Sequence, residues 1–219
     1  GYRDGNALPR DLLLQTVKSI ARVTRAPLTV DIEAGYSDDA GEVETLITQL
    51  IDAGAAGINI EDGADPRELL CAKIAAAKRA ASRSGVNLFV NARIDVYLKK
   101  LATPETRAAE TASRAQQYRD AGADGVFAPG AVLPDEIREI AAATNLPLNL
   151  LAFPGLPPAA ELFALGVKRL SAGSAIAETQ WRNVATLASA FLGDGRSEPL
   201  SAASTPYGEL NALFPALSG

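Results

Sequence analysis

Residues 53–58 read AGAAGI and residues 121–126 read AGADGV, and a weaker copy, ALGV, follows at 164–167. Each copy leads from the end of an apolar stripe with helical spacing into a short, continuous apolar run. A tight turn from a helix into a strand recurs in folds that alternate the two elements. The pattern therefore predicts a repeating α/β fold.

Outward from these turns, apolar residues alternate between helical stripes and short runs along most of the chain. Helices are predicted near residues 11–24, 43–51, 67–84, 104–120, 134–143, 157–165 and 174–192. Strands are predicted at residues 28–33, 57–61, 87–92, 125–128, 146–152 and 167–171. Strict alternation predicts a parallel sheet, and the repeated turn favours a closed (β/α)₈ TIM-type barrel over an open, doubly wound sheet.

A (β/α)₈ barrel needs eight strands, and the sequence predicts only six. It also contains no methionine, so we expect Gly1 to be an internal position of a longer gene product that supplies the first two βα units. Residues 1–192 are predicted to form strands three to eight with their helices, and residues 193–219 a C-terminal linker and docking segment. Within that segment we expect a flexible connection over 197–206. An apolar stripe follows it at Tyr207, Leu210, Leu213 and Phe214.

The composition excludes several classes of function. The chain of 219 residues carries a net charge of −5 and no basic stripe, so nucleic acid and anionic membranes are not expected partners. No apolar run approaches the ~20 residues of a membrane span. The absence of histidine excludes Ser-His-Asp and Cys-His nucleophilic systems and His-ligated zinc. The single cysteine, Cys71, cannot form an internal disulfide, and a cytoplasmic location is expected.

Acidic residues gather at the predicted ends of three consecutive strands. Asp31 and Glu33 end the first, Glu61 and Asp62 the second, and Arg93 with Asp95 follows the third. Function collects at these C-terminal strand ends in a barrel. Converging carboxylates without His or Cys repel one another unless a hard cation such as Mg²⁺ or Mn²⁺ lies between them. Arg93 is a suitable fork for a substrate carboxylate.

Simpler roles compete for several of these residues. Asp62 fits a helix cap or loop anchor, and Asp95 fits either a salt bridge to Arg93 or a catalytic role. Structural hydrogen bonding remains an alternative for Asn59 and Asn91. Packing within a helix is expected for Cys71, and solvated helix positions are expected for Lys73 and Lys78.

Three stretches together resemble the isocitrate lyase/phosphoenolpyruvate mutase superfamily: residues 29–36 (TVDIEAGY), 53–62 (AGAAGINIED) and 91–95 (NARID). The resemblance runs over essentially the whole chain. It implies a (β/α)₈ barrel, Mg²⁺ and α-keto acid or enolate intermediates. It also implies tetramers built from dimers that exchange a C-terminal helix.

The resemblance assigns roles to individual residues. Asp31, Glu33 and Glu61 correspond to metal-site acids, some of them acting through water, and Arg93 corresponds to the clamp for the substrate carboxylate. Residues 148–155 (LNLLAFPG) resemble the strand end from which Asn149 would reach the substrate. We therefore predict a metal site at Asp31, Glu33 and Glu61, catalytic roles for Arg93 and Glu61, and substrate binding by Arg93, Asn91 and Asn149.

One stretch departs from the family pattern. The carbon–carbon lyases of the superfamily carry a Lys-Lys-Cys-Gly-His segment after the Glu-Asp pair, and its cysteine is the catalytic acid. Residues 63–73 read GADPRELLCAK instead, and Cys71 stands among Leu69, Leu70 and Ile74. Cleavage of isocitrate or methylisocitrate by the usual mechanism is therefore not expected.

These observations predict a Mg²⁺-dependent lyase, decarboxylase, hydrolase or mutase that acts on a small α-keto acid as a homodimer or homotetramer. Two alternatives remain. A phosphosugar-type barrel enzyme would use residues 171–174 (SAGS) to cradle a phosphate at a helix N-terminus, although residues 125–128 offer no Schiff-base lysine. A non-catalytic relative would bind a keto acid without turning it over.

Overall fold

The computed structural model describes residues 1–202 and 204–214. These residues form two compact units that divide between Ser171 and Ala172. The first unit contains all six strands, and the second contains only helices.

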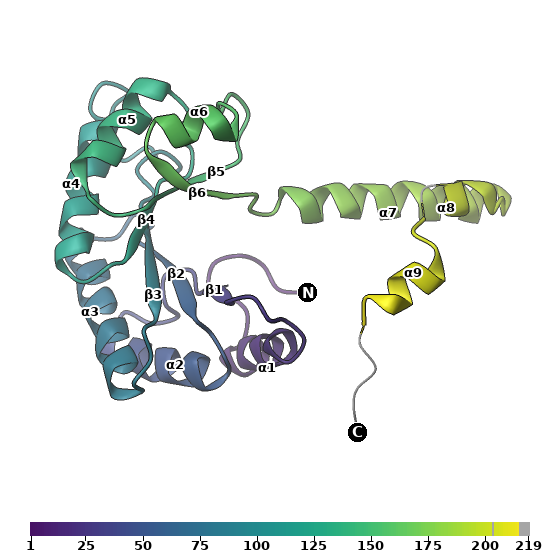
Figure 1. The fold of residues 1–219 in the computed structure, drawn as a ribbon, viewed down its shortest axis with the longest axis horizontal. Coiled ribbons are helices and arrows are strands. Elements are labelled where there is room, and N and C mark those ends of the chain that lie inside the picture. The colour runs from purple at the N-terminus through teal and green to yellow at the C-terminus, as the bar shows by residue number, and fades with distance from the viewer. Residues whose placement is uncertain (203, 215–219) are drawn as a thin grey trace. The chain divides into compact units, whose positions relative to one another are not determined.

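The first unit alternates strands and helices, as predicted. Its strands are β1 (Thr29–Asp31), β2 (Gly57–Glu61), β3 (Phe89–Arg93), β4 (Gly125–Phe127), β5 (Leu148–Leu151) and β6 (Val167–Ser171). Its helices are α1 (Arg10–Ala21), α2 (Ala40–Asp52), α3 (Arg67–Arg83), α4 (Arg107–Asp120), α5 (Pro134–Ala143) and α6 (Ala159–Ala164). The strands form one parallel sheet in the order β1-β2-β3-β4-β5-β6. Figure 1 shows the helices along the outer side of this sheet.

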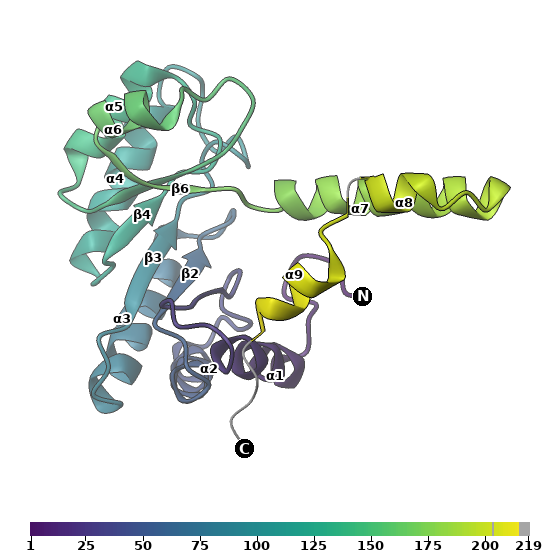
Figure 2. The ribbon, with the colours of Figure 1, turned by 45° about the vertical axis from the view of Figure 1, so that its right-hand side comes forward.

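The sheet curls strongly from its first strand to its last. Five spacings of ~4.8 Å would put β1 and β6 about 24 Å apart in a flat sheet. Instead, the Nη2 atom of Arg169 on β6 lies 3.4 Å from the Oγ1 atom of Thr29 on β1. Figure 2 shows the strands curving in this way. The first unit is thus an α/β half-barrel, consistent with a partial TIM-type barrel, and the two further βα units before Gly1 stay a prediction.

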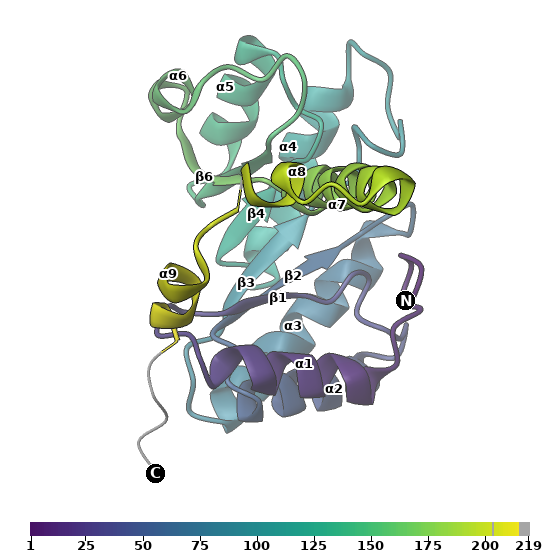
Figure 3. The same ribbon diagram turned by 90° about the vertical axis from the view of Figure 1, so that its right-hand side faces the viewer.

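The alternation of side chains along each strand separates the core from the inner face. On β2, Ile58 and Ile60 are fully buried, and they belong to the core cluster that also contains Leu46 and Leu50 of α2. Asn59 and Glu61, which point the other way, are half-buried on the inner face. Figure 3 shows α1 and α2 side by side on the outer side of β1 and β2. The polar residues of β2 are therefore left for the inner face.

The repeated AGAxG sequence has a physical cause in the way two helices end. Gly54 and Gly122 have φ angles of 102° and 109°, a region that favours glycine. In each copy the next amide donates back to the last turn of the helix, from Ala55 to Leu50 and from Ala123 to the carbonyl of Tyr118, both at 2.9 Å. This is the Schellman arrangement that ends a helix and turns the chain toward the next strand.

The second unit consists of α7 (Ala175–Asp194), α8 (Glu198–Ala202) and α9 (Tyr207–Ala212). No residue of these helices is buried. Within the connection predicted over 197–206, residues 198–202 form α8 with Pro199 in its first turn, where proline is tolerated; the flexibility of this connection stays a prediction. The predicted boundary between residues 192 and 193 stays a prediction. Among the described residues, no helix is long and apolar enough to cross a membrane.

Candidate active site

The register of the sheet aligns four predicted or neighbouring residues at one level of the inner face. Glu61 pairs with Arg93, Arg93 with Phe127, and Phe127 with Asn149. Glu33 joins the same level, since its carbonyl accepts the Glu61 amide at 2.9 Å. Four strands thus bring an anion, a cation, an aromatic ring and an amide into one row.

A second polar level lies one step nearer the start of the strands. Asp31 pairs with Asn59, and Asn59 pairs with Asn91. The Asn91 Nδ2 atom donates to Asn59 Oδ1 at 2.9 Å. This contact favours the structural role of the two asparagines, and substrate binding by Asn91 stays a prediction.

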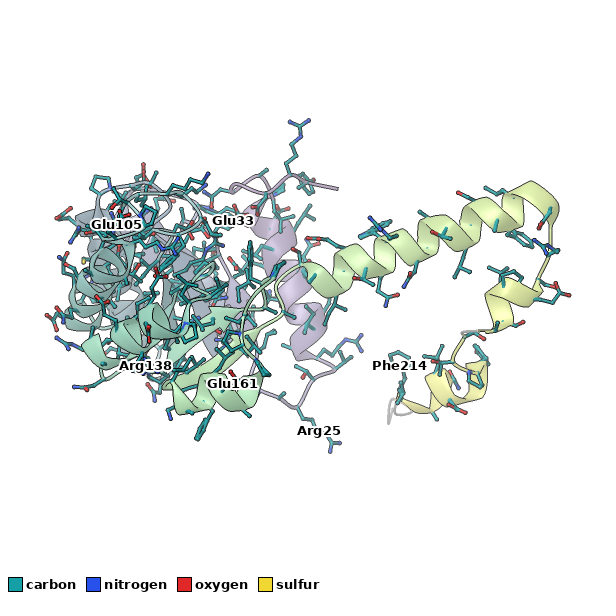
Figure 4. All side chains as sticks on the ribbon, turned by 90° about the horizontal axis from the view of Figure 1, so that it is seen from above. Arg25, Glu33, Glu105, Arg138, Glu161 and Phe214 are labelled. Atoms are coloured by element: carbon teal, nitrogen blue, oxygen red, sulfur yellow. The ribbon has the colours of Figure 1, made fainter. Side chains whose placement is uncertain are left out.

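The loop after β1 holds Glu33 in an uncommon backbone conformation. Glu33 has a φ angle of 50°, and its amide donates to Asp31 Oδ1 at 2.9 Å. Its Oε2 atom accepts a hydrogen bond from the backbone N–H of Asn6. Figure 4 places Glu33 at the same end of the first unit as Glu105, opposite Arg25. The acid therefore lies at the C-terminal end of the strands, where chemistry is expected.

Arg93 is held by acids on two sides. Its Nε and Nη2 atoms donate to Asp95 at 2.7 and 3.2 Å, and its Nη1 atom lies 2.7 Å from Glu61 Oε2. Burial lowers the pKa of Arg93. The hydrogen bond and charge of Asp95 raise it, and the charges of Glu61 and Asp31 add to this effect, so the net shift is upward. Each terminal nitrogen carries two N–H groups, and Asp95 accepts from only one of these four, so N–H groups remain on both terminal nitrogens for a ligand.

Glu61 lies where negative charge is poorly compensated. Burial raises the pKa of Glu61 to about 7, and although Arg93 lowers it, Asp95, Asp31 and Asp4 add to the rise. A raised pKa means that this carboxylate is costly to ionise unless a cation approaches it. A cation near Glu61 would therefore favour its ionised form.

The predicted metal residues fit Mg²⁺ by their chemistry. Within residues 1–202 and 204–214, no three Asp, Glu, Cys or His side chains come close enough to hold a metal ion together. Asp31, Glu33 and Glu61 are therefore not a ready three-ligand cluster. Mg²⁺ usually keeps several waters and binds through one or two carboxylates. Asp31 and Glu61 share the inner face, and the charge of Asp31 adds to the rise in the pKa of Glu61, so these two acids fit that smaller requirement.

Asn149 presents a buried donor on the same level. The side chain is 1% exposed, and its Oδ1 atom accepts from the Ser171 hydroxyl at 3.1 Å. Its Nδ2 atom has no hydrogen-bond partner among the described residues. A buried amide without a partner costs about 1–3 kcal/mol. A ligand oxygen on the inner face would satisfy it, so the atom fits the predicted role in substrate binding.

The prediction that Lys73 and Lys78 occupy solvated helix positions is wrong. Lys73 is 2% exposed, and its Nζ atom donates to the Ala34 carbonyl at 2.8 Å and to Asp38 at 3.1 Å. Lys78 pairs with Asp124 at 2.9 Å. The apolar stripe of α3 gave no sign of these contacts, because their partners lie more than thirty residues away in the chain.

Two acids take the simpler of their predicted roles. Asp95 is buried and forms the salt bridge to Arg93. Asp62 is buried and anchors the loop after β2. The anchor includes Arg114 and Tyr118 of α4, which sequence reasoning missed. An arginine and a tyrosine in an Ala-rich helix carry no signal that distinguishes them from solvated positions.

Cys71 has the packing role that was expected. It is half-buried against the core, and its Sγ atom lies 3.9 Å from the Gln117 carbonyl. Burial raises the pKa of the Cys71 thiol. A raised pKa lowers the fraction of the reactive thiolate, which agrees with a packing role.

Comparison with known proteins identifies relatives of this chain. Residues 1–192 match the family model described as phosphoenolpyruvate phosphomutase. The chain is 38% identical over 213 residues to an uncharacterised protein of Mycobacterium tuberculosis, covering 97% of this chain and 78% of that protein. It is 32% identical over 142 residues to an oxaloacetate decarboxylase of Bradyrhizobium sp., covering 63% of this chain and 49% of that enzyme.

A solved structure supports the same relationship. The chain is 28% identical to a phosphonopyruvate hydrolase determined in complex with oxalate and Mg²⁺. The two superpose with a TM-score of 0.79 over 94% of this chain and 75% of the hydrolase.

The contacts of Lys73 predict that the loop after β1 depends on this side chain. Lys73→Ala removes a buried stem and the donor to the Ala34 carbonyl, so we expect a loss of about 2–4 kcal/mol in the free energy of unfolding. Urea unfolding measures this loss. Lys18→Ala, at an exposed position of α1, is the control and should change stability by less than ~0.5 kcal/mol. Equal midpoints for the two variants would contradict the assignment.

Proposed function

The chain belongs to the phosphoenolpyruvate phosphomutase family, whose named relatives here act on carbon–carbon or carbon–phosphorus bonds, and on that premise we propose a Mg²⁺-dependent enzyme that cleaves or rearranges such a bond in a small α-keto acid. The observation that carries the proposal is the single row of Glu61, Arg93 and Asn149 on the inner face, next to Asp31.

Arg93 would bind the substrate carboxylate. Asp95 and Glu61 contact two sides of the guanidinium, which fixes its plane and leaves N–H groups on both terminal nitrogens. Two parallel N–H groups match the two oxygens of a carboxylate. The residue would therefore orient one end of a keto acid on the inner face.

Asp31 and Glu61 would hold Mg²⁺, with Glu33 reaching it through a water molecule. When bound, Mg²⁺ polarises substrate oxygens and neutralises negative charge as a bond breaks. Asn149 would donate its free N–H to a second substrate oxygen. Phe127, 5% exposed, would exclude water from the floor of the row.

The choice among reactions follows from the proton donors that are missing. The sequence contains no histidine, and its only cysteine is half-buried and packs against the core. Cleavage that needs a thiol acid is therefore disfavoured. Decarboxylation or hydrolysis of a keto acid makes a smaller demand on an acid, and both occur among the named relatives. Nothing observed at residues 171–174 favours the phosphosugar alternative, since the Ser171 hydroxyl is engaged by Asn149. A cytoplasmic location also stays a proposal.

The second unit supports the proposal of a homodimer or homotetramer. Large apolar side chains of α7 are exposed, among them Trp181 at 75% and Leu192 at 84%. Exposed apolar surface of this extent marks an interaction site. A second copy of the chain is the occupant that the family resemblance implies.

A ligand panel tests the proposed reaction class. We expect oxalate, pyruvate or oxaloacetate to raise the melting temperature only when Mg²⁺ is present. A ligand at ~100 times its Kd adds about 2.7 kcal/mol to the stability of the folded state. Arg93→Ala should abolish the shift by carboxylates, and Asp31→Asn should abolish its dependence on Mg²⁺. The control is Arg138→Ala, an exposed arginine of α5, which should respond as the wild type does.

Binding and turnover separate the enzyme from the non-catalytic alternative. Stabilisation by keto acids without turnover would favour the binding relative. If no panel member shifts the melting temperature with Mg²⁺ present, the proposed function is wrong.

Replacement of Trp181 tests the assembly. Trp181→Glu places a charge where an apolar contact is proposed, so we expect the assembled species to dissociate by at least one step. Size-exclusion chromatography with light scattering measures this. Arg182→Glu, at the neighbouring exposed position, is the control for added negative charge. A monomeric wild type, or an unchanged mass for Trp181→Glu, would contradict the proposal.

A further inference from the structure

Asp62 ties the end of β2 to the end of β3 on both sides of one peptide segment. Its backbone amide donates to the Arg93 carbonyl at 3.2 Å, and its Oδ1 atom accepts from the Asp95 amide at 2.8 Å. The Ile94 amide between them donates to the Phe127 carbonyl at 2.8 Å. The backbone of residues 93–95 is therefore fixed by three hydrogen bonds from two neighbouring strands.

The fixed backbone of residues 93–95 in turn orients the Arg93 guanidinium. The Asp95 side chain is 0% exposed and binds Arg93 through two nitrogens. The position of the Asp95 carboxylate depends on its own backbone, which Asp62 holds. A change at Asp62 would thus reach Arg93 through one intermediate residue.

Helix α4 supplies the partners that keep the Asp62 carboxylate in place. Its Oδ2 atom accepts from Arg114 Nη1 and from the Tyr118 hydroxyl, both at 2.7 Å. Burial, and then the Asp62 carboxylate, raise the pKa of Tyr118, so the phenol donates as a neutral hydroxyl. Arg114 also donates to Glu110 at 2.8 Å, and Glu110 pairs with Arg67. Every oxygen of Asp62 is thereby occupied.

This arrangement is poorly explained by stability alone. A buried ion pair contributes little net stability compared with apolar packing of the same volume. The hydrogen bonds of Asp62 fix direction instead, and that direction leads to Arg93. The contacts lie between the end of β2 and α4.

We propose that Asp62, Arg114 and Tyr118 are positioning residues that set the orientation of the Arg93 guanidinium and, through it, the affinity of the site for a carboxylate. The second half of this proposal rests on the proposed function. The first half concerns the protein alone.

Tyr118→Phe is the most selective variant. It removes one hydroxyl and leaves the Arg114–Asp62 ion pair in place, so the chain stays folded. Tyr97→Phe is the matched control, because the Tyr97 hydroxyl also donates to a carboxylate, Glu136, at 3.0 Å. Both variants lose one tyrosine–carboxylate hydrogen bond, but only one of them touches Asp62.

The direct readout is the side-chain Nε–H signal of Arg93 in ¹⁵N NMR spectra of the full chain, identified by its loss in Arg93→Lys. We expect its exchange with solvent to quicken by roughly fivefold in Tyr118→Phe, the effect of weakening one hydrogen bond, and to stay unchanged in Tyr97→Phe. The Kd for oxalate with Mg²⁺ should rise by a similar factor in Tyr118→Phe alone. Equal exchange rates in the two variants would overturn the proposal.

The exchange rate of the Arg93 Nε–H and the Kd for oxalate test the two halves of this inference separately. A wild type that does not bind oxalate overturns the proposed function and the affinity half of this inference, while the exchange rates still decide the orientation of Arg93. Oxalate binding that Arg93→Ala abolishes and Tyr118→Phe leaves unchanged overturns the affinity half and leaves the proposed function standing.

Discussion

The pairing of Glu61 with Arg93 across β2 and β3 is the contact on which the site depends. Parallel strands in register place residues of the same level side by side, so an acid and a base at two strand ends meet without any special loop. Their contact of 2.7 Å compensates part of the charge that Asp31 and Asp95 add nearby. The remaining negative charge is what a metal ion would neutralise.

The residue next to this pairing is fixed by the outer layer of the half-barrel. Asp62 lies directly after Glu61 and points the opposite way, into a buried group of hydrogen bonds with α4. The side chains of these two adjacent residues therefore lie on opposite faces of the sheet. Glu61 faces the inner side of the sheet, and Asp62 faces the side that packs against α4.

The fold was largely predictable from the sequence because it depends on local patterns. Turns such as the one at Gly54 need a left-handed residue after a helix, and β2 carries a strict alternation of apolar and polar residues. The strand ends then follow, and with them Arg93 and Glu61. Superfamily membership was confirmed by the family match over residues 1–192.

The contacts between distant residues were not predictable in the same way. Lys73 and Arg114 lie on helices whose stripes suit solvated side chains, yet each is buried against a loop or strand end far away in the chain. Only the packing of α3 and α4 on the sheet reveals their partners. The sequence also indicated a three-acid metal site, and in the described residues those acids approach one another less closely than three ligands require.

The most direct test of the account is a crystal structure of the protein grown with Mn²⁺ and oxalate. Anomalous scattering would locate the metal, and the density would locate the ligand. We expect Mn²⁺ to lie beside Asp31 and Glu61, and one carboxylate of oxalate to contact the guanidinium of Arg93. A metal bound elsewhere, or oxalate that does not contact Arg93, would contradict it.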